Sequence, residues 1–208
     1  MTAGTALLGA LAISAPVQAA PEAAPKPDRM MVIDVESVNG SGCPEGSAVV
    51  QVSPDNTAFT VTYSEYTASV GPKANPLDFR KNCQLGLNIR VPSGFTFAIA
   101  SADYRGYANL HSGARGQQIA SYYFQGHSNT TRSTHNFKGP IDDNWQRTDK
   151  VAIASTSFLP CGEQRYLNIN TELRVNRGTS DRKQTNLLTM DSTDTSLSTI
   201  YRLAWQKC

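Results

Sequence analysis

Helical periodicity is the first feature that this sequence of 208 residues lacks. No window repeats apolar side chains at the spacing of an amphipathic helix, which argues against an α/β architecture with a parallel sheet. No apolar run approaches the roughly 20 residues that a membrane-spanning helix needs, so we expect no membrane span. Charge is also sparse: charged residues make up 17% of the chain and the formal net charge is +2. Lysine and arginine form no basic block, so a nucleic-acid partner is not indicated.

Signatures of catalysis and of metal binding are missing as well. The cysteines include no close Cys-x-x-Cys pair of the kind that binds zinc. The histidines form no His-Glu-x-x-His motif, and no serine lies in a Gly-x-Ser-x-Gly turn. We therefore predict no metal site and no cofactor, and the sequence assigns no catalytic residue. Solvent-exposed loop positions are expected for His111, His127 and His135.

The amino-terminal segment has the pattern of an export signal. An uncharged apolar run over residues 6–13 precedes a proline and the small-residue sequence Val17-Gln18-Ala19, which is typical of a cleavage site. We predict a secretory signal peptide over residues 1–19 and a flexible leader rich in proline and alanine over residues 20–28. The remaining residues, 29–208, are enough for a single domain with a sizeable core. The protein is therefore expected to be secreted.

Four cysteines in an exported chain predict two disulfide bonds, because oxidising compartments favour paired thiols. The sequence alone allows three pairings. We predict that Cys43 pairs with Cys83 and that Cys161 pairs with Cys208. These pairs give two non-crossing loops, one in each half of the chain.

Apolar and polar side chains alternate along most of the chain, which is the period of a half-buried β-strand. In residues 83–91 and 166–175, for example, the apolar side chains occupy one face and the amide and charged side chains the other. Turn sequences separate such segments. The expected strands are residues 31–38, 48–53, 58–65, 83–91, 95–104, 117–124, 151–158, 166–175 and 198–206. We predict an all-β fold, an antiparallel β-sandwich or jelly roll of about nine strands stapled by two disulfides.

The strand expected over residues 95–104 runs into a cluster of charge, tyrosine and glycine. Two-residue alternation places Asp103 on the face of Ile99, and Tyr104 on the opposite face with a row of alanines. Because the first face turns polar after Ile99, we predict that the chain leaves the sandwich near residue 101. The sequence Asp-Tyr-Arg-Gly-Tyr at residues 103–107 would then lie at the rim.

Aromatic side chains with polar neighbours give the best binding signal. An aromatic ring stacks on a sugar or a peptide while amide and guanidinium groups bond to its polar atoms. Core packing is the alternative for part of the set, since alternation sends Tyr122 and Phe124 to the side opposite Tyr123. The candidate ligand contacts are Asp103, Tyr104, Arg105, Tyr107, Tyr123 and Trp145. We expect them to contact a cell-wall or extracellular polysaccharide, or a secreted protein.

Two other functions stay open from the residues alone. An extracellular polysaccharide hydrolase would use two of Asp103, Asp142, Asp143 and Glu163, with carboxyl groups about 5 to 10 Å apart. Adjacent aspartates such as Asp142 and Asp143 are, however, more typical of a turn. A secreted inhibitor or competition factor would present a protruding loop, such as residues 128–140, to a protein partner.

Several segments together resemble one known family. They are CPEGS, VSPDNTAFTVTYSEYTASVG, RKNCQLGLNIRVPSGFTFAIASADYRGYANL and the later YYFQG. These segments are similar to a family of secreted bacterial and fungal proteins known only as domain of unknown function 4360, and the resemblance covers essentially the whole mature chain. It implies secretion, a single domain and paired cysteines, and it implies no catalytic residue.

The function predicted from the sequence is therefore a secreted, disulfide-stapled binding or interaction module that acts at the cell surface or outside the cell. The sequence also contains two N-x-S/T sequons, at Asn39 and Asn129. These would carry glycans only in a eukaryotic secretory pathway.

Overall fold

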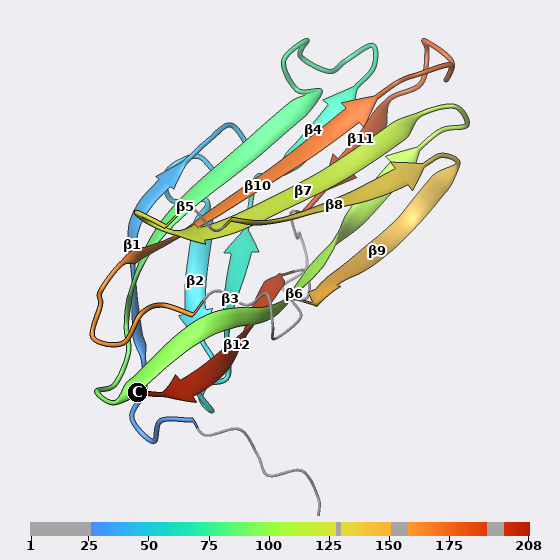
Figure 1. Cartoon of the computed structure of the whole chain (residues 1–208). Coiled ribbons are helices and arrows are strands. Elements are labelled where there is room, and N and C mark those ends of the chain that lie inside the picture. Colours follow the sequence, from blue (N-terminus) through green and yellow to red (C-terminus); the bar gives the residue numbers. More distant parts are fainter. Residues whose placement is uncertain (1–25, 128–129, 151–157, 191–197) are drawn as a thin grey trace, which may run out of the picture.

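A computed structural model of the chain describes residues 26–127, 130–150, 158–190 and 198–208, so the predicted signal peptide, residues 1–19, lies outside the described part. The described residues form twelve β-strands in two antiparallel sheets (Figure 1). The strands are β1 (Val32–Asn39), β2 (Ala48–Val52), β3 (Ala58–Tyr63), β4 (Thr67–Val70), β5 (Arg80–Arg90), β6 (Phe95–Leu110), β7 (Arg115–Phe124), β8 (Thr131–Lys138), β9 (Ile141–Lys150), β10 (Tyr166–Asn176), β11 (Asn186–Thr189) and β12 (Thr199–Lys207). The predicted all-β sandwich is confirmed.

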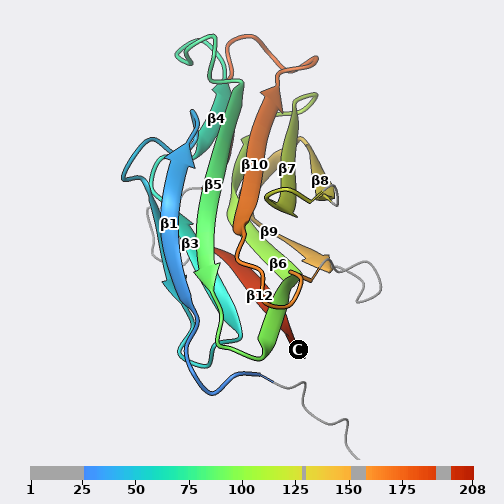
Figure 2. The ribbon, with the colours of Figure 1, turned by 60° about the vertical axis from the view of Figure 1, so that its left-hand side comes forward.

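The two sheets pack face to face around one core. The five-stranded sheet has the order β1-β5-β10-β7-β8, and the seven-stranded sheet has the order β2-β3-β12-β6-β11-β4, with β9 also paired to β6. In Figure 2, β5 and β10 of the first sheet lie in front of β6 and β12 of the second. The apolar residues that alternate along β5 and β10 are buried between the sheets, as in other sandwiches. They include Leu85, Leu87, Ile89, Leu167 and Ile169.

Most strands agree with the alternation of the sequence, and the disagreements have physical reasons. The predicted bounds of β1, β2, β3, β5, β7, β10 and β12 hold within three residues at each end. The strand expected over residues 151–158 lies outside the described part except for its last residue, which is not in a strand. Four strands were not predicted. Strands β4 and β11 have four residues each, and β8 and β9 are edge strands with polar side chains on both faces.

The longest strand, β6, contradicts the prediction that the chain leaves the sandwich near residue 101. It continues to Leu110 and pairs with β12 and β11 on one side and with β9 on the other. Residues 103–107 therefore lie within the sheet instead of at its rim.

A bulge in β6 explains why the alternation misled. Ile99 pairs with Leu203 and Ser101 pairs with Arg202, so Ala100 is an extra residue on β6. An inserted residue shifts every later side chain to the other face of the sheet. Beyond the bulge, the even-numbered side chains of β6 face the core.

Both disulfide bonds join the predicted pairs. Cys43–Cys83 connects the segment between β1 and β2 to β5, and Cys161–Cys208 connects the segment before β10 to the residue after β12. The sequence separations are 40 and 47 residues. Closing loops of this size in the unfolded chain stabilises the fold by about 4 kcal/mol per bond on the chain-entropy estimate.

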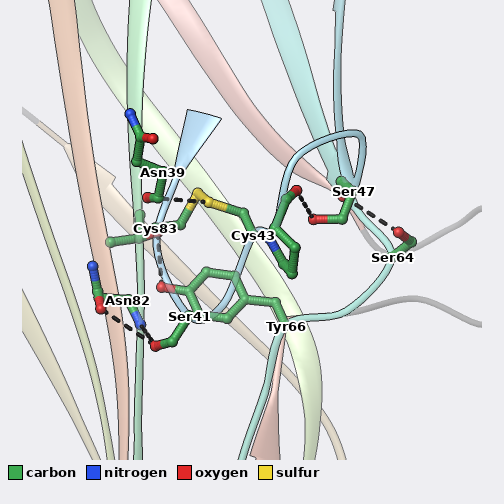
Figure 3. Close-up of a disulfide and its surroundings, with 10 residues drawn as sticks. Asn39, Ser41, Cys43, Ser47, Ser64, Tyr66, Asn82 and Cys83 are labelled. Carbon is green, nitrogen blue, oxygen red and sulfur yellow. Dashed lines mark hydrogen bonds between the residues drawn. A yellow bond between two sulfur atoms is a disulfide. The ribbon is translucent and has the colours of Figure 1, made fainter. Parts of the chain in front are cut away.

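Tyr66 packs beside the first disulfide and joins the two sheets (Figure 3). Its hydroxyl donates a hydrogen bond to Thr171 Oγ1 of β10 over 3.0 Å. A Cβ atom on Gly42 would lie 2.2 Å from the Tyr66 ring, so only glycine fits where the loop passes the ring. The disulfide loop and the core are thus packed as one unit.

The segment before β1 is bound to the domain by one asparagine. Asn56 accepts a hydrogen bond from the Met31 amide and donates one to the Arg29 carbonyl, both over 3.0 Å. Its own carbonyl accepts a bond from Trp205 Nε1 over 2.9 Å. Pro27 is buried as well. The last residues of the segment predicted as a flexible leader therefore contact the domain.

Candidate functional site

The six predicted ligand contacts do not form one surface. Asp103, Tyr104 and Trp145 are buried, with exposed fractions of 5%, 0% and 6%. The other three are half-buried, and two of them lie on β6 of one sheet while the third lies on β7 of the other. The predicted set is therefore divided among the core and two opposite faces of the sandwich.

Two of the predicted contacts are core residues, which corrects the prediction that they touch a ligand. Tyr104 faces inward beyond the bulge, where its ring meets Tyr201 edge to face and its hydroxyl bonds to that of Tyr122. Trp145 packs against Phe137, with ring centroids 5.0 Å apart. Aromatic pairs of this kind stabilise a core beyond the effect of buried area alone.

Asp103 lies on the outer face of the seven-stranded sheet and is covered by its own partners. Its carboxylate accepts hydrogen bonds from Thr148 Oγ1, over 2.6 Å, and from Arg202. Burial raises the pKa of Asp103, but the bonds from Thr148 and Arg202 outweigh burial and hold the pKa below its ordinary value. The carboxylate is thus satisfied within the fold and is not available to a ligand.

Asp142, on the same face, is also bound by neighbouring side chains. Tyr107 and Asn109 both donate to Asp142 Oδ1, the amide over 3.0 Å. These bonds lower the pKa of Asp142, and the bond to Asp142 raises the pKa of the Tyr107 hydroxyl. Arg105 lies on the same strand, and its buried Nε has no hydrogen-bond partner among the described residues.

Asp103 and Asp142, two of the carboxylates considered for hydrolysis, are not brought together. In the β6–β9 ladder, Asp142 pairs with Asn109, six residues along β6 from Asp103. Six strand residues span about 20 Å, well beyond the roughly 10 Å limit for paired catalytic carboxylates. Glu163 lies outside this ladder and forms a 2.9 Å salt bridge with Arg165.

Two segments expected to be loops are strands. Asp142 and Asp143 lie in β9. Asp143 Oδ1 nevertheless accepts a local hydrogen bond from the backbone N–H of Asn144 over 2.7 Å. Most of residues 128–140, expected as a protruding loop, form β8. The sequon at Asn129 lies outside the described residues.

Sequence reasoning missed a polar cluster between the free edges of the two sheets. Asp149 of β9 accepts bonds from Ser133 and, over 2.9 Å, from Tyr122, and its Oδ1 lies 2.8 Å from His135 Nε2. His135 is therefore bound to a carboxylate and is not the solvated loop residue that we expected. The cluster is not a catalytic triad, because the Ser133 hydroxyl donates to Asp149 and not to the imidazole. Its contacts connect β7 and β8 to β9.

The outer face of the five-stranded sheet has a different character. The strand register aligns one polar row across all five strands, from β8 through β7, β10 and β5 to β1. The row consists of Arg132, Ser121, Asn170, Gln84 and Asn39. Four gaps between strands give it a length of about 19 Å. None of its side chains has a hydrogen-bond partner among the described residues, and Asn170 Oδ1 is a buried acceptor without a donor.

A second row lies beside the first. It consists of Tyr123, Asn168, Gly86 and Ser37, which the register aligns across β7, β10, β5 and β1. These side chains also lack hydrogen-bond partners within the described part. We call the two rows together the amide strip. Tyr123, the remaining predicted ligand contact, belongs to it.

The surface over the amide strip is hollowed. A hollow of about 460 Å³ lies over the second row, where Tyr166, 40% exposed, adds another ring. A Cβ atom on Gly86 would lie 2.6 Å from Ser37 Oγ, so glycine keeps the floor of this hollow low. A second hollow of about 250 Å³ lies over the first row, and Gln84 lines both. The two hollows are therefore neighbours along the strip.

Beyond the strip, the polar side chains of this sheet bind one another. Asn88 donates to Glu36 over 3.2 Å and accepts from Gln164 over 3.0 Å. On the other side, Glu172 forms salt bridges with Arg80 and Arg174. These polar groups of the same face are thus satisfied within the fold, unlike those of the strip.

The sequence contained part of this signal. Its outward positions on β5 and β10 are amides such as Gln84 and Asn170 where exposed strands more often carry lysine or glutamate. Their alignment depends on strand register, which one sequence does not give. Within the residues described, no group of three or more acidic, histidine or cysteine side chains is placed to bind a metal ion. No helix in that part of the chain could cross a membrane.

Comparisons with known proteins place the chain among secreted proteins without assigned activity. The family described as "Domain of unknown function (DUF4360)" matches residues 29–208. A relative from Arthroderma benhamiae, named an uncharacterized secreted protein, is 42% identical over 185 residues, 89% of this chain and 74% of the relative.

Among solved structures, the chain is similar to the enzymatically active domain of tailspike protein 4 from bacteriophage CBA120. That similarity has 13% identity and a TM-score of 0.27, and it covers 83% of this chain but 19% of the tailspike chain. The chain thus spans about a fifth of that structure, and a likeness at this level carries no argument about function.

Proposed function

We propose, from the premise that this chain belongs to the DUF4360 family, that it is a secreted binding module whose amide strip binds an extended extracellular polysaccharide. The observation that carries the proposal is the alignment of eight polar side chains and one glycine in two rows, none of which has a hydrogen-bond partner among the described residues. On the opposite sheet, by contrast, Asp103 and Asp142 accept hydrogen bonds from neighbouring side chains.

The chemistry of the strip matches that of a sugar chain. Each side-chain amide offers one acceptor and two donor hydrogens, and a sugar hydroxyl both donates and accepts. The rings of Tyr123 and Tyr166 can stack on the apolar face of a sugar ring while their hydroxyls stay in water. The hollows over the strip adjoin one another, so a polymer fits better than a single sugar.

The scaffold favours such binding on energetic grounds. The side chains of the strip stand on a five-stranded sheet whose inner face belongs to the core. A preorganised surface loses little conformational freedom when it binds, which leaves more of the interaction energy as affinity. A hydrolase that pairs Asp103 with Asp142 has no comparable support, since these residues lie about 20 Å apart along the β6–β9 ladder.

The test is retention of the oxidised protein, residues 20–208, on insoluble polysaccharides: cellulose, chitin, and fungal and bacterial cell walls. We expect retention without release of sugar. The variant Tyr123→Ala, Asn168→Ala, Asn170→Ala should lose retention by at least tenfold, since each lost contact contributes to binding.

The matched control removes two exposed amides from the opposite sheet, in the variant Asn144→Ala, Gln146→Ala. It should bind as the wild type does. Equal losses in the two variants, or no retention of the wild type on any of these materials, would refute the proposal. Circular dichroism checks that both variants fold.

A further inference from the structure

The β8 end of the amide strip carries an arginine without a partner. Arg132 is exposed, and its guanidinium forms no salt bridge or hydrogen bond with any described residue. In the register it lies beside Ser121, which in turn lies beside Asn170. A guanidinium next to a hydroxyl and an amide is a set of donors that suits an anionic oxygen.

The hollow at this end has an excess of positive charge. Arg80 and Arg132 both line it, and Glu172 is the one carboxylate in its lining. Glu172 also forms a salt bridge with Arg174. Two arginines and one glutamate in the lining leave one positive charge in excess. Because Glu172 also forms a salt bridge with Arg80, Arg132 carries this excess charge.

The β1 end of the strip has the opposite character. Glu36 lines the larger hollow, and Asp34 lies on the same strand, where it forms a 2.7 Å salt bridge with Arg90. No acidic side chain faces outward on β8, where Arg132 and Lys138 supply the charge. An anionic group of a ligand would therefore be favoured at the β8 end over the β1 end, where Glu36 lines the hollow.

Resting on the proposed function, we infer that the β8 end of the amide strip is a subsite for an anionic substituent, so that the ligand is an acidic polysaccharide. The shared chemistry is an anionic oxygen group on a sugar, either the carboxylate of a uronic acid or a sulfate ester. Arg132 would donate two parallel hydrogen bonds to this group. Ser121 and Asn170 would donate to a neighbouring oxygen.

The experiment measures dissociation constants for soluble polymers that differ in charge. The carboxylate arm compares polygalacturonic acid with its fully methyl-esterified form, which keeps the backbone and removes the charge. The sulfate arm compares dextran sulfate with dextran. We expect tighter binding of the charged member in one arm, and that arm identifies the substituent. The preference should weaken as salt concentration rises, because the site is exposed.

The test variant is Arg132→Gln, and its matched control is Lys138→Gln, an equal loss of charge on the outward face of the same strand. Arg132→Gln should weaken binding of the preferred charged polymer about tenfold, because a charge-assisted bidentate contact is lost. It should also flatten the salt dependence. Lys138→Gln should change binding less than twofold.

The outcomes separate the two proposals. Equal binding of charged and uncharged members in both arms would overturn the acidic subsite, and so would equal effects of the two charge variants. If the wild type then still binds a neutral polymer and Asn168→Ala, Asn170→Ala abolishes that binding, the polysaccharide-binding function stands while the subsite fails. If the protein binds none of these polymers or the insoluble materials, both proposals fail.

Discussion

The two outer faces of the sandwich use similar side chains in different ways. On the seven-stranded sheet, Asp103 binds Thr148 and Arg202, and Asp142 binds Tyr107 and Asn109. On the five-stranded sheet, the amide strip leaves its polar groups without partners among the described residues. A satisfied polar cluster stabilises the fold it belongs to. A partly exposed row without partners contributes little to stability and remains available to a ligand.

This comparison assigns stability to one face and binding to the other. If it is correct, substitutions on the two faces should have separable effects. Variants of the seven-stranded face should lower the free energy of unfolding and leave binding intact. Variants of the amide strip should weaken binding and leave the free energy of unfolding nearly unchanged.

The largest expected effect is that of Asp103→Ala. Asp103 is buried and accepts bonds from Thr148 and Arg202. Its removal should lower the free energy of unfolding by about 3 kcal/mol, because the charge-assisted hydrogen bonds that Thr148 and Arg202 donate to the carboxylate are lost. Urea unfolding measures the loss. The control is Asn168→Ala, which changes an outward side chain of the amide strip and should change the free energy of unfolding by less than about 0.5 kcal/mol. Equal losses in the two variants would contradict the difference between the faces.

Acid should act on the same face. The folded state holds the pKa of Asp103 and Asp142 below the ordinary value of 3.8. Their contribution to stability is therefore complete above the unfolded pKa and is lost as the pH falls through the lower folded pKa. The urea concentration at the midpoint of unfolding, measured at pH values from 6 down to 2, should begin to decrease once the pH is below about 4. In Asp103→Asn this decline should be shallower, and an unchanged slope would contradict the assignment.

A small change in stability, with a clear change in binding, is expected of Gly86→Ala. The added Cβ would meet Ser37 Oγ at 2.6 Å, but this atom ends a short side chain that can rotate away. The free energy of unfolding should therefore change by less than about 1 kcal/mol. Retention on polysaccharide should fall severalfold, because the methyl group rises into the hollow over the strip. Full retention would remove this hollow from the proposed site.

The sequence was sufficient for the sandwich and for the faces of its regular strands. Alternation in β5 and β10 separated the buried leucines from the outward amides, and the two disulfides joined the predicted pairs. Alternation predicts the faces of a strand only where no residue is inserted, and β6 contains an inserted residue. The extra residue at Ala100 reversed the faces of β6, which sent Tyr104 into the core.

The edge strands were hidden for a different reason. Inward positions of β8 and β9 carry Ser133, His135 and Asp149, which satisfy one another across the gap between the sheets. A polar residue at an inward position breaks the apolar alternation that identifies a strand. The amide strip was hidden because its members come from five strands, and only the register aligns Gln84 with Asn170.

The most direct test of polysaccharide binding by the amide strip is an NMR titration that follows the side-chain NH₂ resonances of asparagine and glutamine. The ligands are the hexasaccharides of galacturonic acid and of β-1,4-linked glucose, added separately to the oxidised protein. If the amide strip is the binding surface, the resonances of Gln84, Asn168 and Asn170 should shift with at least one of these ligands. Those of Asn144 and Gln146 on the opposite sheet should not shift. Shifts confined to Asn144 and Gln146 would place the binding surface on the wrong sheet and contradict the account.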